Sequence, residues 1–178
     1  MKRITLVFAA AIASTIVANA QSFDSTGATT MSVTVAPEAS ISVGTSTTTL
    51  GSSGTLFSNY AGLTNFSYKM RTTATGGTGA ITLKVTSDFN NAGGPSVTTP
   101  PTSGDVLAYV CTSAASGTAC SGSQTSATSS ETPVVSFGAD AHSTLVGDSG
   151  STSWTLTNDP KYKTGASSAT VTFTISAS

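Results

Sequence analysis

Short runs of alternating apolar and polar residues limit how this chain can fold more than any other feature of its sequence. Alternation with a period of two places apolar side chains on one face of a β-strand, whereas a helix needs a period near 3.6. The clearest runs are Phe66, Tyr68 and Met70, then Ile81, Leu83 and Val85. Each run ends at a cluster of glycine, serine, asparagine or proline, which favours turns. The pattern predicts an all-β protein.

Later runs and the composition extend this prediction. Threonine, valine and isoleucine, which favour strands, are abundant, and no stretch after the first twenty residues has the helical period. Further strands are expected around Val106 to Cys111, Val134 to Phe137, Trp154 with Leu156, and Ala169 to Ile175. Many short strands separated by turns are typical of an antiparallel β-sandwich, immunoglobulin-like or pilin-like, of about eight to ten strands. Residues 21–178 are long enough for a single domain with one core.

The N-terminus has the pattern of a secretory signal peptide over residues 1–20. Lys2 and Arg3 precede an apolar run that ends near Val17, and Ala18-Asn19-Ala20 supplies a small-x-small cleavage site. The run is shorter than the roughly 20 residues that span a bilayer. We therefore expect cleavage between Ala20 and Gln21, and a secreted protein without a membrane anchor, in the periplasm, on the cell surface or outside the cell.

Both cysteines, Cys111 and Cys120, lie in one short stretch of small and polar residues. Oxidising compartments keep such pairs bridged, so export predicts a disulfide. The chain has only two cysteines and one histidine and no Cys-x-x-Cys motif, which gives no zinc site. We expect the disulfide to staple a β-hairpin with Gly117 at its bend.

The charge of the chain limits its partners. Only 8% of the residues are charged, and without Lys2 and Arg3 five basic residues face eight acidic ones. Nucleic acids and anionic membranes bind basic surfaces, so neither is an expected partner. Partners predicted instead are other copies of the chain, other surface proteins or carbohydrate.

The segment GDSGS, residues 147–151, is similar to the nucleophile motif of chymotrypsin-like serine proteases. Such an enzyme requires a histidine base and an orienting carboxylate, in the chain order His, Asp, Ser. The single histidine, His142, lies seven residues before Ser149 instead of on an early, separate strand. We therefore interpret the segment as a glycine-rich turn and predict no catalytic residue. TATGGTGAI, residues 73–81, lacks the lysine of a phosphate-binding loop and is interpreted as a hairpin turn.

Acidic residues are scattered at predicted loop ends, where calcium sites often occur. They show no Asp-x-Asp-x-Asp spacing, which calcium-binding loops of the EF-hand type require. The sequence therefore predicts no metal site and no cofactor. The residues considered are Asp88, Asp105, Asp140, Asp148 and Asp159.

The segment 29–43 follows a polar leader and carries apolar residues in one phase. Such a strand at a chain end can pair within its own sheet or add to the exposed edge of a neighbouring molecule. Pro37 interrupts it, so two short strands joined at a kink are expected. We predict that this assembly strand packs beside the C-terminal strand Ala169 to Ile175 of the next copy. Its apolar residues are Met31, Val33, Val35, Ala39, Ile41 and Val43.

Both ends of the chain resemble bacterial secreted β-sandwich proteins of the pilin and spore-coat type. The resemblance rests on the signal peptide, the Thr/Ser-rich strands, TTMSVTVAPEASISV near the start, and the close DPKYKTGASSATVTFTI. It implies a final strand that pairs with an exposed N-terminal strand, and a non-enzymatic structural role in a surface fibre, coat or extracellular matrix. In chaperone-assembled pilins the disulfide usually joins the first strand to the second, whereas both cysteines here lie mid-chain.

A secreted carbohydrate- or ligand-binding module is the alternative function. Sugar rings stack on exposed aromatic side chains, of which such modules present two or three on a flat face. Trp154 is in phase with Leu156 and is predicted to lie in the core, which leaves Tyr60 and Tyr162 as the aromatic residues available for a ligand.

Overall fold

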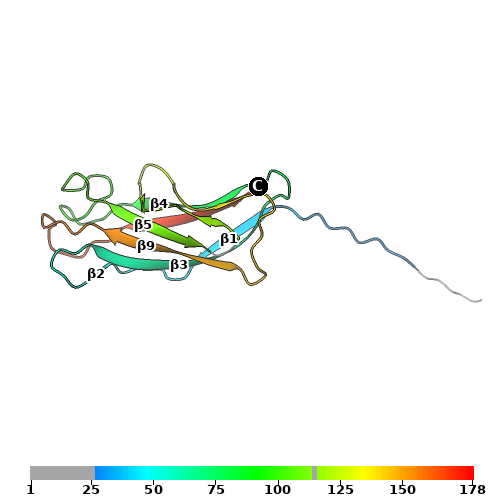
Figure 1. Ribbon diagram of the computed structural model, residues 1–178, viewed down its shortest axis with the longest axis horizontal. Helices are drawn as coiled ribbons and strands as arrows, with labels where there is room; N and C mark the ends of the chain where they lie inside the picture. The colour runs from blue at the N-terminus through cyan, green and yellow to red at the C-terminus, as the bar shows by residue number, and fades with distance from the viewer. Residues whose placement is uncertain (1–26, 114–115) are drawn as a thin grey trace, which may run out of the picture. The chain divides into compact units, whose positions relative to one another are not determined.

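The computed structural model describes residues 27–113 and 116–178, so the predicted signal peptide and the Ala20–Gln21 cleavage lie outside the described residues. The described residues contain ten strands and no helix (Figure 1). Every strand pair is antiparallel. The strands are β1 (Glu38–Val43), β2 (Gly51–Ser52), β3 (Tyr60–Arg71), β4 (Gly79–Ser87), β5 (Leu107–Ser113), β6 (Thr118–Ala119), β7 (Gln124–Thr125), β8 (Thr132–Phe137), β9 (Asp148–Leu156) and β10 (Thr170–Ala177). The prediction of an all-β chain is confirmed.

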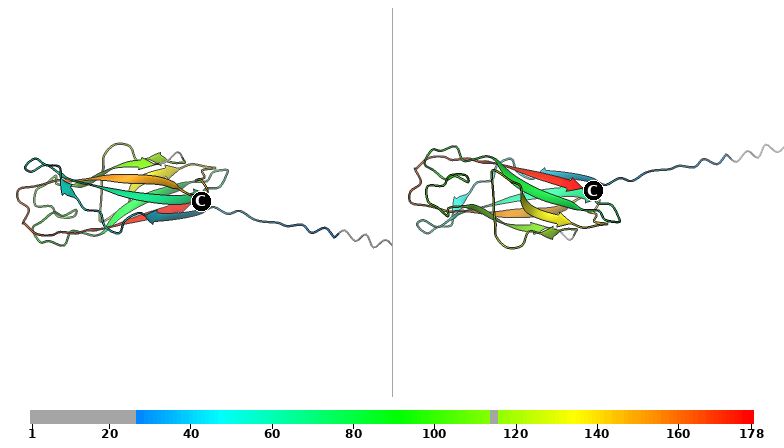
Figure 2. Two further views of the ribbon diagram at one scale, coloured as in Figure 1. Left: turned by 90° about the horizontal axis from the view of Figure 1, so that it is seen from below. Right: turned by 90° about the horizontal axis from the view of Figure 1, so that it is seen from above.

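The strands form two sheets that enclose one core (Figure 2). The six-stranded sheet has the order β1-β3-β9-β5-β7, with β2 also paired to β3, and the four-stranded sheet has the order β10-β4-β8-β6. The chain divides between Thr34 and Val35 into two units, and both sheets belong to the second. Residues 27–34 of the first unit contain no strand.

The core consists of the inward-facing residues that the alternation predicts. The buried residues are Phe66, Tyr68, Met70, Ile81, Leu83, Val85, Leu107, Tyr109, Cys111, Val134, Val135, Phe137, Trp154 and Leu156. Trp154 is only 5% exposed, which confirms its predicted place in the core. Its indole N–H donates to Thr64 Oγ1 at 2.9 Å, as a buried tryptophan requires.

Cys111 and Cys120 form the predicted disulfide, with their Cα atoms 5.4 Å apart. The prediction of a stapled hairpin is wrong, because β5 pairs with β9 and β7, whereas β6 pairs with β8 in the other sheet. The disulfide therefore joins the two sheets. Gly117 lies at this crossing and has no room for a side chain, since an added Cβ would lie 2.5 Å from atoms of Val135 and Phe137.

Two other predicted pairings are also wrong. Residues 73–78 lead from β3 in one sheet to β4 in the other, so they form a crossover and not a hairpin turn. The C-terminal strand β10 pairs with β4 and not with the N-terminal strand β1, which pairs with β3. The strands β1 and β10 nevertheless lie side by side, each as the last strand of its sheet (Figure 2).

Candidate functional site: the β1 and β10 edge

The core is only partly covered at the edge formed by β1 and β10. The inward-facing residues of these strands are only partly buried and pack against the core: Ala39, Ile41, Val171, Phe173 and Ile175. Phe173 contacts the buried Phe66, with ring centroids 5.7 Å apart. Each strand has a neighbour on one side only, so each presents a row of free backbone N–H and C=O groups.

The strand β10 lacks charge, proline and short length, three features by which proteins protect a sheet edge, and its one register shift lies at its first residue, between Thr170 and Val171. Natural edge strands are often very short, or carry lysine or proline, because a long apolar edge invites pairing with another chain. The eight residues of β10, TVTFTISA, contain no charge and no proline. In β1 the only charged residue is Glu38. A second extended segment therefore finds free hydrogen-bonding groups and apolar side chains along β10.

The predicted assembly strand is a strand in its second half only. Ala39, Ile41 and Val43 lie in β1, whose six residues begin directly after Pro37. Residues 29–37 form no strand, which corrects the predicted strand before the proline. In that segment Met31, Val33 and Val35 are 92%, 85% and 65% exposed. A run of alternating apolar side chains is thus left without a partner, because a strand needs a neighbour for its backbone groups.

Arg71 fixes the point at which the chain enters β1. Its Nε–H donates to the Ala36 carbonyl at 2.5 Å, and its Nη2 lies 2.7 Å from Glu38 Oε2. Glu38 also pairs with Arg71 in the antiparallel ladder. Residues 36–38 are therefore held in line with β1.

Four residues of GDSGS, 148–151, lie in β9, which corrects the predicted turn for them; only Gly147 belongs to the turn before the strand, with a φ of 96°. The inward residue Gly150 lies opposite Phe66, and an added Cβ would lie 2.5 Å from the Phe66 ring, so the motif needs this glycine for packing. The Asp148 carboxylate accepts hydrogen bonds from Ser116 Oγ and from the Thr144 N–H. The hydrogen bond from Ser116 lowers the pKa of Asp148.

The outward residue Ser149 lies away from the side chains that a triad would need. His142 Nε2 lies 3.2 Å from Asp140 Oδ1, and both side chains are more than half exposed. Between residues 27 and 178, with 114 and 115 set aside, no hydrogen bond joins Ser149 to His142. The contacts of GDSGS therefore concern the packing and hydrogen bonding of the strand.

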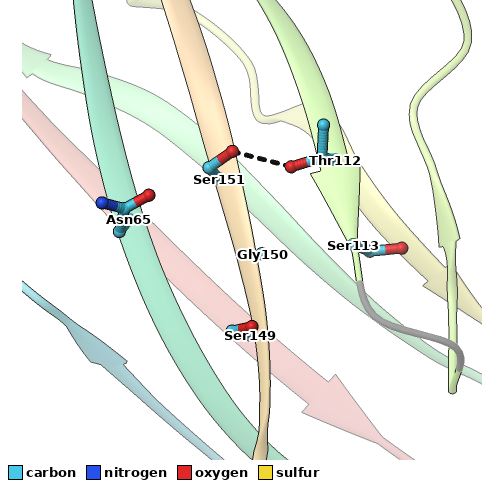
Figure 3. A pocket seen from close by; sticks show the side chains of 6 residues that line it. All are labelled: Asn65, Thr112, Ser113, Ser149, Gly150 and Ser151. Atoms are coloured by element: carbon cyan, nitrogen blue, oxygen red, sulfur yellow. Dashed lines mark hydrogen bonds between the residues drawn. The ribbon is translucent and has the colours of Figure 1, made fainter.

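A shallow hollow of about 400 Å³ lies over Ser149 on the outer face of the six-stranded sheet (Figure 3). Its lining is small and polar: Asn65, Thr112, Ser113, Ser149, Gly150 and Ser151. Thr112 Oγ1 and Ser151 Oγ lie 2.7 Å apart and satisfy each other. No aromatic ring lines it, so it lacks the stacking surface that a sugar site uses. Of the two tyrosines predicted to be available, Tyr60 packs against the core and Tyr162 is partly buried.

No three histidine, cysteine, aspartate or glutamate side chains come together as a metal site in the described part of the chain. That part also contains no helix long and apolar enough to cross a membrane. Comparison of the chain with protein-family models, curated protein sequences and solved structures finds no match.

The sequence predicts the apolar face of β1 but not the free edge of β10. It predicted Ala39, Ile41 and Val43 beside the C-terminal strand of the next copy, whereas β1 pairs with β3 and lies beside β10 within one chain. It did not show that β10 is the last strand of its sheet. The sequence signal for that edge was available, since residues 170–177 contain neither charge nor proline.

Proposed function

We propose that this chain is a secreted, non-enzymatic structural protein of a bacterial surface fibre, coat or extracellular matrix, with an immunoglobulin-like or pilin-like sandwich. In the assembled state, residues 29–35 of one copy add as a strand to the free edge of β10 in the next copy. The observation that carries this proposal is the long, uncharged edge of β10 beside a partly covered core. Addition of a strand to a free sheet edge is a common mode of protein association.

The chemistry of the two segments is complementary. Residues 29–35, TTMSVTV, contain no charge and no proline, like β10. Met31, Val33 and Val35 share one phase, so one face of the added strand would cover the core beside Phe173 while Ser32 and Thr34 face water. The backbone groups of both segments, which are otherwise bonded to water, would form the ladder.

The geometry of the chain favours exchange between copies over pairing within one copy. The strand β1 begins opposite Arg71, and β10 ends opposite Gly79, so the chain enters the domain at the pole where β10 ends. Arg71 holds residues 36–38 in line with β1. Pairing within one copy would require a reversal inside residues 29–35, and that turn would use residues of the alternating run.

The energetics predict assembly that depends on concentration. Covering three apolar side chains contributes about 4.5–9 kcal/mol at roughly 1.5–3 kcal/mol each. Ordering seven residues costs about 7–14 kcal/mol at roughly 1–2 kcal/mol each. The two terms are of similar size, so the ladder hydrogen bonds and the local concentration of subunits decide the outcome.

The proposed function also requires that the protein is exported from the cytoplasm. The Cys111–Cys120 disulfide is typical of proteins in oxidising compartments. The signal-peptide pattern of residues 1–20 supports the same compartment.

The test compares the mature chain, residues 21–178, with a variant that lacks residues 21–36. We expect the mature chain to form polymers at high concentration in sedimentation velocity and electron microscopy, and the deletion variant to stay monomeric. A triple variant, Met31→Ser, Val33→Ser and Val35→Ser, should behave like the deletion. The matched control, Ser32→Asn with Thr34→Asn, changes the other face of the strand and should still polymerise.

Three outcomes would contradict the proposal. Fibres from the deletion variant would show that β10 pairs with another edge, such as a second β10. A control variant as defective as the triple variant would show that the apolar phase is unimportant. A mature chain that stays monomeric at every concentration would instead favour the ligand-binding alternative.

A further inference from the structure

Two acidic residues that lie far apart in the sequence meet at the pole opposite the chain entry. Asp105 lies two residues before β5, and Asp159 lies three residues after β9. The ladder pairs Leu107 with Leu156, so the segments beyond these two residues are neighbours. Thr102 links them, because its carbonyl accepts from the Asp105 N–H at 3.2 Å and its Oγ1 donates to Asp159 Oδ2. The Tyr162 N–H donates to the Asp159 carbonyl at 3.0 Å.

Asp105 is buried without a hydrogen-bonding partner for one of its oxygens. The residue is only 9% exposed, and its Oδ2 makes no hydrogen bond. The Tyr162 hydroxyl is also buried and makes no hydrogen bond. An unpaired buried carboxylate oxygen costs several kcal/mol unless a proton or a cation satisfies it.

Among the described residues no salt bridge reaches either carboxylate, and the nearest cation along the chain is Lys161, two residues after Asp159. In the part of the chain that the structure describes, the ion pairs are Arg71–Glu38 and His142–Asp140, and neither involves Asp105 or Asp159. Asp159 accepts hydrogen bonds from Thr102 Oγ1 and, at 2.9 Å, from the Lys161 backbone N–H.

We propose that Asp105 and Asp159, together with oxygens of Thr102 and water, bind a calcium ion at this pole. The donors are all oxygen, which hard cations prefer, and histidine and cysteine take no part. Calcium accepts six to eight oxygens in flexible geometry and completes its shell with carbonyl groups and water, whereas magnesium demands a near-ideal octahedron. Two carboxylates place the affinity in the weak range of extracellular modules, about 0.1–1 mM.

The ion would connect the two longest loops of the domain. Asp105 ends the loop 88–106, and Asp159 belongs to the loop 157–169. Hydrogen bonds already join these loops, from the Lys163 N–H to the Gly93 carbonyl and from Asn91 Nδ2 to the Lys163 carbonyl. Calcium would add a link at their base and so stabilise the folded state by mass action. This inference is independent of strand exchange.

The test is thermal unfolding of the mature protein with 10 mM CaCl2, 10 mM MgCl2 or EDTA, together with calorimetric titration of calcium. We expect calcium to raise the Tm by about 3–5 °C relative to EDTA, and magnesium to raise it much less. Asp159→Asn and Asp105→Asn should each abolish the rise, and Asp159→Asn is the safer variant because Asp159 is only partly buried, whereas Asp105 is 9% exposed. Asp140→Asn, at the other pole, is the matched control and should keep the full rise.

A Tyr162→Phe variant separates the cation from the alternative that the phenol donates its proton to Asp105. If calcium is the partner, the variant keeps the calcium response. The proposal is overturned if the intact protein shows neither heat of binding nor a Tm shift, or if Asp159→Asn responds to calcium like the intact protein. It is equally overturned if Tyr162→Phe alone removes the response.

Discussion

The edge strands on the two sides of this domain differ in length and in covalent linkage. On one side the edge strands β6 and β7 are two residues long, and the Cys111–Cys120 disulfide joins the sheets between them. On the other side the edge strands β1 and β10 have six and eight residues, and no disulfide crosses from one to the other. Short strands leave little backbone free for pairing, whereas long apolar ones invite it.

The difference shows where covalent and non-covalent stabilisation are used. On the disulfide side the core residues Val134, Val135 and Phe137 are at most 5% exposed. At the edges themselves both sides are only partly buried, with Ala119 and Cys120 on the disulfide side and the inward residues of β1 and β10 on the other. A side that is bridged by sulfur cannot open to admit a strand without breaking a bond. Assembly is therefore expected on the side that has no bridge.

The largest expected effect separates two phenylalanines, one on each side. Phe137→Ala should lower the free energy of unfolding by about 3–5 kcal/mol, because it leaves a cavity in a closed part of the core. Phe173→Ala should cost about half as much in dilute, monomeric protein, since that ring is already partly exposed. Urea denaturation of both variants measures the difference. Equal losses would show that the two sides are packed alike.

The next effect concerns the bridge itself. Replacing both cysteines with alanine should lower the free energy of unfolding by about 2–3 kcal/mol, because the short loop is no longer closed in the unfolded chain. The fold should persist, since the core is built from strands beyond the bridge. The intact protein should not react with thiol reagents until it is reduced. As a control, a reducing agent should shift the stability of the intact protein and leave that of the double variant unchanged.

A smaller effect on the free energy of unfolding should come from Asp88, which directly follows β4 and lies in neither pair of edge strands. Burial raises the pKa of Asp88, but hydrogen bonds from the Val97 N–H, Ser96 Oγ, and the N–H groups of Thr98 and Phe89 lower it more, to about 2. The pKa in the folded state is thus below the ordinary 3.8. The stabilisation is therefore complete above about pH 5 and lost as the pH falls toward 2.

Asp88→Asn should remove this pH-dependent part, on the order of 1 kcal/mol once solvent screening is considered. Urea denaturation at pH 3 and pH 6 measures it. The difference between the two pH values should shrink in the variant, while the disulfide and any polymerisation stay as they are. An unchanged pH dependence would contradict the role given to this carboxylate.

The strands were predictable wherever one face is apolar. A buried face imposes an apolar period of two on a strand. This period predicts β3 from Phe66, Tyr68 and Met70. It predicts β4 from Ile81, Leu83 and Val85. The start of β9 was missed because its inward positions are Asp148, Gly150 and Thr152. The Phe66 ring fills the space above Gly150, so the signal that explains this glycine lies eighty-four residues earlier in the chain.

Sheet membership could not be predicted from local sequence. The segment after β5 and residues 73–78 are rich in the small and polar residues of hairpin turns, yet the strands before and after each belong to different sheets. Whether such a connection turns back or crosses over depends on which distant strands cover the core. The same limit applies to Asp105 and Asp159, since only the pairing of β5 with β9 brings the two carboxylates together. For residues 29–37 the pattern was read correctly as apolar alternation, but a strand also needs a neighbour.

The pairing of β1 with β3 has a mechanical consequence for any subunit that is pulled by its N-terminus. The six rungs from Glu38↔Arg71 to Val43↔Phe66 run perpendicular to a force directed along β1. Such a force shears all rungs together instead of opening them one at a time. The disulfide lies outside this load path, between β5 and β6, so it would bear tension only after β1 had been torn from its sheet. The resistance of the subunit to stretching should therefore depend on the pairing of β1 and on the hydrogen bonds of Arg71 to Ala36 and Glu38. It should not depend on the redox state of the cysteines.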